Sequence, residues 1–114
     1  MTSHIDRWQA RIQLIKQELL DLGPMRPGAL SEQYNVCGKP NCKCKDPRRP
    51  KKHGPYYQLS YTHQGKSTTE FIKRDMLDEV RQQLANYASF KQLTDEWVEL
   101  SVRIAKRRKA QSRR

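Results

Sequence analysis

The chain has 114 residues, of which 35% are hydrophobic and 31% charged, and a formal net charge of +11. This length suits one folding unit, and the hydrophobic share lies below the roughly 45–50% of ordinary globular domains. A chain with so little apolar material is expected to need a metal ion or a partner subunit to fold firmly.

Membrane insertion and secretion are not expected. No apolar run approaches the ~20 residues that would cross a bilayer. The first residues, Met1 to Asp6, lack the basic and then apolar layout of a secretory signal. We therefore expect a cytoplasmic protein whose thiols stay reduced. Three cysteines cannot form a closed set of disulfides, so a bound metal explains them better.

The N-terminal element, residues 1–23, is predicted to be an amphipathic helix over residues 3–22. Ser3 and Asp6 resemble a weak capping box at its start, and Gly23-Pro24 ends it. Its apolar residues are spaced by three and four, which is typical of a helix–helix seam: Ile5, Trp8, Ile12, Ile15, Leu19 and Leu22.

The central element, residues 24–73, is predicted to be a loop followed by a β-hairpin. Residues 24–55 hold all six prolines and all three cysteines and show no helical or strand periodicity, so we expect them to be irregular. Residues 56–72 alternate in polarity on both sides of the turn His63-Gln64-Gly65-Lys66, which indicates two antiparallel strands. Tyr57 and Tyr61 are expected on the inner face of this hairpin.

The third element, residues 74–108, is predicted to be a second helix, followed by a basic tail at residues 109–114. Residues from Arg107 onward are expected to be disordered in the free protein. The helix carries an apolar stripe: Leu77, Val80, Leu84, Tyr87, Phe90, Leu93, Trp97, Leu100 and Ile104. At 1.5 Å per residue it would be about 20 Å longer than the first helix. Part of its stripe would then be uncovered, so we predict a homodimer.

The predicted fold class is α+β, with two long helices forming an antiparallel stalk. A small zinc-stabilised loop and β-hairpin module is expected between the two helices in the chain, so that the whole forms one folding unit.

A cluster of metal-binding residue types lies in the central loop. Cys37, Cys42 and Cys44 occur within eight residues, and His53 follows. Three thiolates and one imidazole are a set that structural zinc takes, so these four residues are the predicted ligands and zinc the predicted cofactor. His63 is the competing fourth ligand, but it lies in the predicted turn. The alternative is three partly buried free thiols beside an exposed histidine.

The positive charge is concentrated in two places. Residues 36–53 hold seven bases against Asp46 alone, residues 103–114 hold seven bases and no acid, and the remainder is slightly acidic. Such a concentration is typical of proteins that bind nucleic acid. The predicted contact residues are Lys39, Lys43, Lys45, Arg48, Arg49, Lys51, Lys52, Tyr56, Lys66, Arg107, Arg108 and Lys109.

The segment from Met25 to Tyr87 resembles an uncharacterised prokaryotic family of small basic proteins. The signature is carried by Cys37-Gly38-Lys39-Pro40-Asn41-Cys42-Lys43-Cys44 and by His53-Gly54-Pro55-Tyr56-Tyr57. The resemblance implies the same metal ligands and, through that family's association with mobile elements and phage genomes, a DNA-linked role. More distantly, residues 56–72 with the following helix are similar to the arm-binding modules of tyrosine recombinases.

We therefore predict a zinc-stabilised accessory or regulatory protein that binds nucleic acid, DNA in preference to RNA, and takes no small-molecule substrate. Asp46 is the single carboxylate of the cysteine loop, and a four-ligand zinc site has no open position for water, so no enzymatic activity is expected. The alternative is a protein-interaction adaptor or inhibitor. It would act on an acidic partner through its coiled helices and basic surface.

Overall fold

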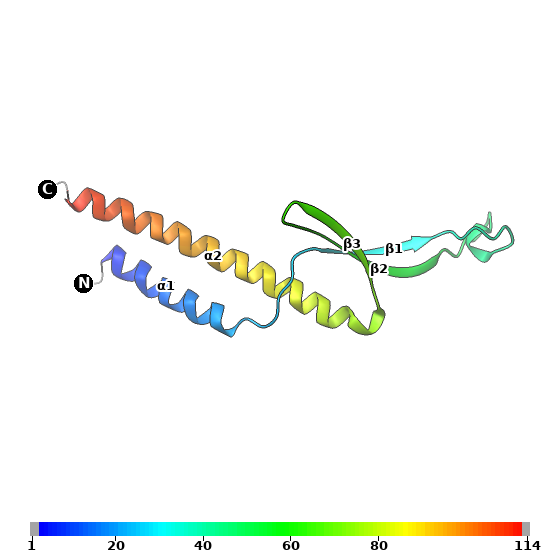
Figure 1. The fold of residues 1–114 in the computed structure, drawn as a ribbon, viewed down its shortest axis with the longest axis horizontal. Helices are drawn as coiled ribbons and strands as arrows, with labels where there is room; N and C mark the ends of the chain where they lie inside the picture. The colour runs from blue at the N-terminus through cyan, green and yellow to red at the C-terminus, as the bar shows by residue number, and fades with distance from the viewer. Residues whose placement is uncertain (1–2, 113–114) are drawn as a thin grey trace. The chain divides into compact units, whose positions relative to one another are not determined.

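The computed structural model describes residues 3–112, which form two compact units (Figure 1). The helical unit contains residues 3–25 and 85–112, and the sheet unit contains residues 26–84. In chain order the regular elements are α1 (His4–Asp21), β1 (Ala29–Asn35), β2 (His53–His63), β3 (Lys66–Ile72) and α2 (Leu77–Ser112). The mixed α+β class predicted from the sequence is confirmed.

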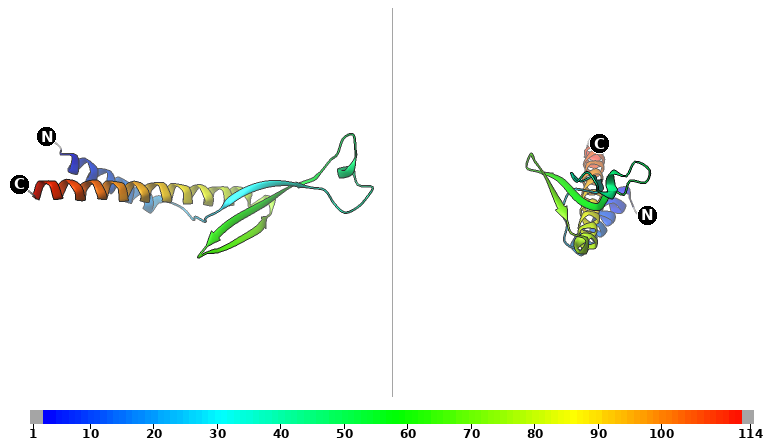
Figure 2. Two further views of the ribbon diagram at one scale, coloured as in Figure 1. Left: turned by 90° about the horizontal axis from the view of Figure 1, so that it is seen from above. Right: turned by 90° about the vertical axis from the view of Figure 1, so that its right-hand side faces the viewer.

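In the helical unit, α1 packs antiparallel against the C-terminal part of α2 (Figures 1 and 2). The predicted helix–helix seam is therefore confirmed within this unit. Neither helix in residues 3–112 combines the length and the hydrophobicity needed to cross a membrane. Four buried residues form the core, and five partly buried ones surround it: Ile12, Ile15, Leu100 and Ile104, then Ile5, Trp8, Leu19, Leu93 and Trp97.

Polar contacts fix the start of α1 and its pairing with α2. The predicted capping box is present, because the Asp6 amide donates to Ser3 Oγ at 3.1 Å and the Ser3 amide donates to Asp6 Oδ2 at 3.4 Å. Between the helices, the Arg11 guanidinium donates to both carboxylate oxygens of Glu96, at 2.7 and 2.9 Å. Its hydrogen bond lowers the pKa of Glu96 below the usual range. This paired geometry sets the register of the two helices more than it adds stability.

The C-terminal end of α2 differs from the prediction. The expectation of a disordered tail from Arg107 is wrong for residues 107–112, which continue the helix to Ser112, and residues 113–114 lie outside the described residues. Lys, Arg, Ala and Gln are good helix formers, and cations in the last turns suit the helix dipole. Leu93 and Trp97 of the apolar stripe pack against the core that α1 and α2 share, whereas Phe90 of the same stripe is exposed.

The sheet unit is built on three antiparallel strands in the order β1-β2-β3. The predicted hairpin is confirmed as β2 and β3, although β2 begins earlier, at His53. Gln64 and Gly65 both have positive φ, 52° and 77°, which is the conformation of a tight two-residue hairpin turn. Leu59 lies at the centre of β2 and is fully buried.

The strand β1 corrects the prediction that residues 24–55 are irregular throughout. Every side chain of Ala29–Asn35 except Leu30 is exposed, so the segment has no apolar alternation that would mark it as a strand. It is held by backbone pairing with β2, which Gly28 permits. With φ of +134°, a Cβ at Gly28 would lie 2.9 Å from the carbonyl oxygen of Ser60.

Arg26 connects three elements of the sheet unit. Its guanidinium binds Glu70 of β3 at 2.5 Å and lies over the Tyr61 ring of β2, with 6.0 Å between the guanidinium carbon and the ring centroid. Its backbone amide donates to the Gln83 carbonyl at 3.3 Å, in the first turns of α2. Arg26 therefore fixes both the sheet edge and the start of α2 within this unit.

We predict that Ile15→Ala lowers the free energy of unfolding by about 2–5 kcal/mol, because Ile15 is 0% exposed at the helix–helix seam. The matched control is Leu20→Ala on the same helix. Leu20 is 77% exposed, so this change should stay within about 0.5 kcal/mol. Urea denaturation followed by far-ultraviolet circular dichroism measures both, and equal losses in the two variants would contradict the observed seam.

Candidate metal centre

Pairing of β1 with β2 brings together two of the four metal-binding residues. Asn35 at the end of β1 lies opposite His53 at the start of β2. Cys37 follows Asn35 by two residues, so it leaves the sheet at the same end as the imidazole. The strand that sequence patterns did not reveal is therefore the element that places Cys37 beside His53.

The other two thiols come from a short 3-10 turn, Lys43–Lys45, in the connection between β1 and β2. Cys42 immediately precedes the turn and Cys44 lies in it. The Lys45 amide donates to the Cys42 carbonyl at 3.0 Å, and the Cys42 amide donates to the Lys39 carbonyl at 3.4 Å. These bonds fold residues 39–45 so that both sulfurs turn toward Cys37 and His53.

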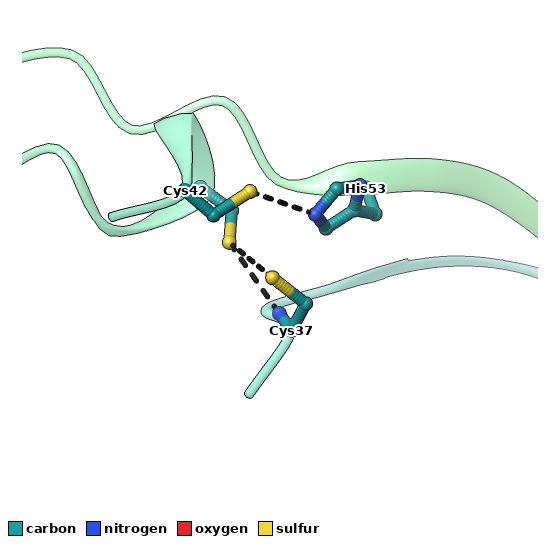
Figure 3. A group of neighbouring side chains, drawn as sticks. Cys37, Cys42 and His53 are labelled. Atoms are coloured by element: carbon teal, nitrogen blue, oxygen red, sulfur yellow. Dashed lines mark hydrogen bonds between the residues drawn. The ribbon is translucent and has the colours of Figure 1, made fainter. Parts of the chain in front are cut away.

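The ligand atoms of the four residues lie close together, and Figure 3 shows Cys37, Cys42 and His53 of this group. One ligand atom from each of Cys37, Cys42, Cys44 and His53 lies within 4.8 Å of the others. The Cys37 and Cys44 sulfurs are 3.6 Å apart, and the Cys42 sulfur is 3.1 Å from His53 Nε2. A tetrahedral metal with S and N ligands would separate sulfurs by about 3.8 Å and sulfur from nitrogen by about 3.6 Å. The cluster could therefore hold a metal ion.

The competing ligand, His63, does not reach this cluster. It lies at the opposite end of β2, where it pairs with Lys66 across the hairpin turn. His53 is the histidine whose ring meets a cysteine sulfur. Of the two histidines weighed from the sequence, the structure thus brings only His53 to the thiols.

The local environment changes the acidity of two thiols in opposite directions. The pKa of Cys42 falls to about 6, first because the Cys44 backbone amide donates a hydrogen bond to its sulfur and then because of the Cys37 and Cys44 side chains. The pKa of Cys44 is raised, mainly because this thiol is only 2% exposed. Metal ligation requires the thiolate, so Cys42 is the thiol already suited to bind at neutral pH.

Gly54 permits the strands to approach closely beside the cluster. Its φ is +137°, and a Cβ there would lie 2.7 Å from the Gln33 carbonyl oxygen of β1. A larger residue would therefore strain the backbone and push the two strands apart next to His53. This contact gives a physical reason for the glycine in the His53-Gly54-Pro55 sequence.

Asp46 shapes the loop that follows the cysteines. Its Oδ1 accepts hydrogen bonds from the backbone amides of Arg48 and Arg49, at 2.9 and 3.4 Å. The Lys51 amide then donates back to the Lys43 carbonyl at 2.9 Å. The only carboxylate of residues 36–53 is thus engaged in folding the basic loop.

The predicted nucleic-acid contact residues fall into three places. The seven bases of residues 36–53 are exposed in the loop around the four-residue cluster, and Tyr56, 41% exposed, follows His53 on β2. Lys66 lies at the hairpin turn, at the other end of β2. Arg107, Arg108 and Lys109 are exposed on α2 in the helical unit. Tyr57 and Tyr61 are half-buried, in line with the inner face expected for them.

Three surface residues beside Tyr56 were missed by sequence reasoning. Phe71 of β3 is 69% exposed, and Lys73 and Arg74 follow it; all three line a shallow pocket together with Tyr56. The sequence did contain one signal. Phe71 and Ile72 are adjacent in the predicted strand, so their side chains point to opposite faces and only one of them can face the core. Sequence alone does not say which of them is exposed.

Comparison with known proteins gives one match. The sequence model of a family described as a domain of unknown function, DUF6788, matches residues 5–82. The chain belongs to the DUF6788 family. The matched range of this DUF6788 protein includes α1, the sheet and all four residues of the cluster. The resemblance to an uncharacterised family is therefore confirmed.

The searches of curated proteins and of solved structures gave no match to this DUF6788 protein. Its distant similarity to the arm-binding modules of tyrosine recombinases therefore stays a prediction.

We predict that His53→Ala weakens metal binding, whereas His63→Ala leaves it unchanged, because only His53 meets the thiols. Titration of the metal-free protein with Co²⁺ reports the site, since tetrahedral thiolate coordination gives intense visible absorption. The His53→Ala spectrum should shift or weaken, with affinity reduced by at least about tenfold. Loss of the spectrum in His63→Ala, or no difference between the two variants, would contradict the assigned ligand set.

Proposed function

We propose that this DUF6788 protein is a nucleic-acid-binding accessory or regulatory protein whose basic loop is held in shape by structural zinc. The observation that carries the proposal is the interleaving of seven exposed bases with the four clustered ligands in residues 36–53. Whatever closes the cluster also fixes the positions of the bases. A pre-ordered cationic loop loses less conformational entropy when it binds a polyanion.

Zinc is the metal that best suits the donor set. Thiolate and imidazole ligands favour zinc over the harder cations magnesium and calcium, and four protein ligands complete its tetrahedral shell. The site then has no open position for a reactive water, and its role is structural. Three thiolates and Zn²⁺ together carry a charge of −1, which leaves residues 36–53 at about +5.

Positive charge at the loop supports a phosphate backbone as the ligand. Lysine and arginine contacts displace counterions from nucleic acid, and this term supplies most of the sequence-independent affinity. We infer DNA in preference to RNA, because the family resemblance associates such proteins with mobile elements and phage. The bases at Arg107, Arg108 and Lys109 add a second cationic surface on a helix, and Lys66 adds one at the hairpin turn.

The alternative is an adaptor or inhibitor that binds an acidic protein. One observation favours it: a groove lined by residues of α1 and α2 includes the apolar Ile12 and Ile104 and the basic Lys16 and Arg108. Such a groove suits an amphipathic helix with acidic flanks. Co-purification with an acidic protein, and not with nucleic acid, would favour this function.

We predict that the logarithm of the DNA association constant falls with the logarithm of salt concentration at a slope near −5, as about six neutralised phosphates imply. The double substitution Arg48→Ala with Arg49→Ala should reduce that slope to about −3, since each lost phosphate contact removes about one unit. The hydrogen bonds to Asp46 come from the backbone amides of these residues, so they survive the substitution.

The matched control for this experiment removes two exposed arginines outside the loop, Arg7 and Arg81. Arg7→Ala with Arg81→Ala has the same net charge as the loop variant and should keep the wild-type slope. Fluorescence anisotropy with a labelled duplex, from about 50 to 200 mM salt, measures all three proteins. Equal slopes in the two double variants would locate binding outside the loop. No binding at about 50 mM salt would refute the proposed function.

We also predict a homodimer that forms through an apolar groove on α2, which is lined by the exposed Val98 and Val102 and by the half-buried Trp97. Covering this groove with a second copy would remove apolar surface from water. Light scattering at tens of micromolar should give twice the monomer mass for the wild type and the monomer mass for Val98→Glu. Leu14→Glu, at an exposed position of α1, is the control. A monomeric wild type would contradict the prediction.

A further inference from the structure

The outward face of the sheet carries two large aromatic side chains. Strand alternation puts Tyr57 and Leu59 of β2 on the inner face and Tyr56 and Gln58 on the outer face. Phe71 of β3 lies opposite Gln58 and is therefore also outward. Its 69% exposure is unusual for a phenylalanine on an otherwise polar strand face. Exposed apolar groups of this kind mark binding sites.

The two rings are neighbours on the sheet. Tyr56 is two residues from Gln58, the partner of Phe71, so the rings occupy diagonal positions on adjacent strands. Residues in this relation lie within reach of one another's large side chains. Both line the same shallow pocket, and Pro55 contributes to its wall. The pair thus forms a small aromatic platform at the end of the sheet that also carries His53.

The other outward positions of β2 and β3 that pair with one another along the hairpin are polar. Ser60 shares a hydrogen bond with Thr69 at 3.2 Å, and Thr62 shares one with Ser67 at 3.0 Å. Each hydroxyl keeps a further lone pair for an incoming donor. The outward face therefore combines stacking surface at one end with hydrogen-bonding groups along its length.

Two cationic residues lie beside the aromatic pair. Lys73 and Arg74 line the same pocket, and no carboxylate lines it among the described residues. The strand β2 that carries Tyr56 begins at His53, directly after the basic loop. A ligand on this pocket would thus meet flat aromatic rings flanked by cations.

We propose that this pocket binds single-stranded nucleic acid, with an unpaired base stacked on Phe71 and Tyr56 and the neighbouring phosphates bound by Lys73 and Arg74. The inference rests on the proposed function and gives it a preferred form of ligand. In a duplex each base face is covered by its neighbours, whereas a single strand presents free faces to aromatic side chains. The cations select a polyanionic strand over an uncharged ligand.

The test compares Phe71→Ala with Phe71→Trp in the metal-loaded full chain. The probe is labelled oligodeoxythymidylate of about 12 residues, followed by fluorescence anisotropy at about 50 mM salt. Loss of one stacking ring should weaken binding about 5- to 150-fold, whereas the tryptophan variant should bind within about twofold of the wild type. Duplex of equal length should change by less than about twofold in both.

Two further measurements separate stacking from charge and from misfolding. Arg74→Ala should lower the salt slope by about one while keeping the aromatic contact. Phe71 is exposed, so circular dichroism and metal content should be unchanged in its variants. Both native tryptophans, Trp8 and Trp97, lie in the helical unit. The Phe71→Trp protein therefore carries a reporter in the sheet unit, and oligodeoxythymidylate should quench its additional fluorescence.

Three results would overturn the inference. If the wild type binds the oligonucleotide and Phe71→Ala and Tyr56→Ala bind it equally well, the aromatic platform is not the site, although the proposed function stands. If poly-glutamate competes equally and with the same dependence on Phe71, the pocket takes acidic protein segments. If the wild type binds neither single strand nor duplex, the proposed function fails and this inference fails with it.

Discussion

Convergence of Cys37, Cys42, Cys44 and His53 is the constraint on which the basic loop depends. Between β1 and β2, Cys44 is the only buried residue, and every base of the loop is exposed. Apolar burial therefore contributes little to the shape of this segment. A few backbone hydrogen bonds and the Asp46 turn order parts of it. Coordination of one ion by all four ligands would supply the missing tertiary link, because such binding energy is also folding energy.

The clustering of the four ligands also bears on the electrostatic repulsion between the bases of the loop. Seven like charges in eighteen residues repel one another and favour open conformations of the loop. Hydrogen bonds from backbone amides, such as that from Cys37 to the Cys44 sulfur at 3.4 Å, stabilise negative charge at the centre of the loop. Coordination of an ion by three thiolates would place their negative charge among the cations, and the ion would offset the repulsion between the sulfurs. The exposed side chains of the loop would then stay positive around a nearly neutral centre.

The elements that could be predicted from the sequence are those marked by the periodicity or the spacing of residue types. Ile12 and Ile15 are found at the helix seam because residues three and four apart share a helix face, and the hairpin follows from alternation around Gln64-Gly65. The strand β1 could not be found this way, because a strand exposed on nearly all positions has no pattern. The strand β1 forms because its backbone pairs with that of β2. The clustering of the four ligands was predictable from residue type, and the choice of His53 over His63 followed from the predicted turn. The register of the sheet places the two histidines at opposite ends of β2, in agreement with that choice.

The two units differ in what stabilises their folded structure, and we expect them to differ in function as well. The helical unit is closed by an apolar seam around Ile15. The sheet unit buries only Leu59, Leu77, Val80 and Cys44, too few for a firm core by themselves. Its outer face is consequently free to carry Tyr56 and Phe71. Stabilisation of the sheet unit by metal coordination would leave the aromatic and cationic side chains available at the surface.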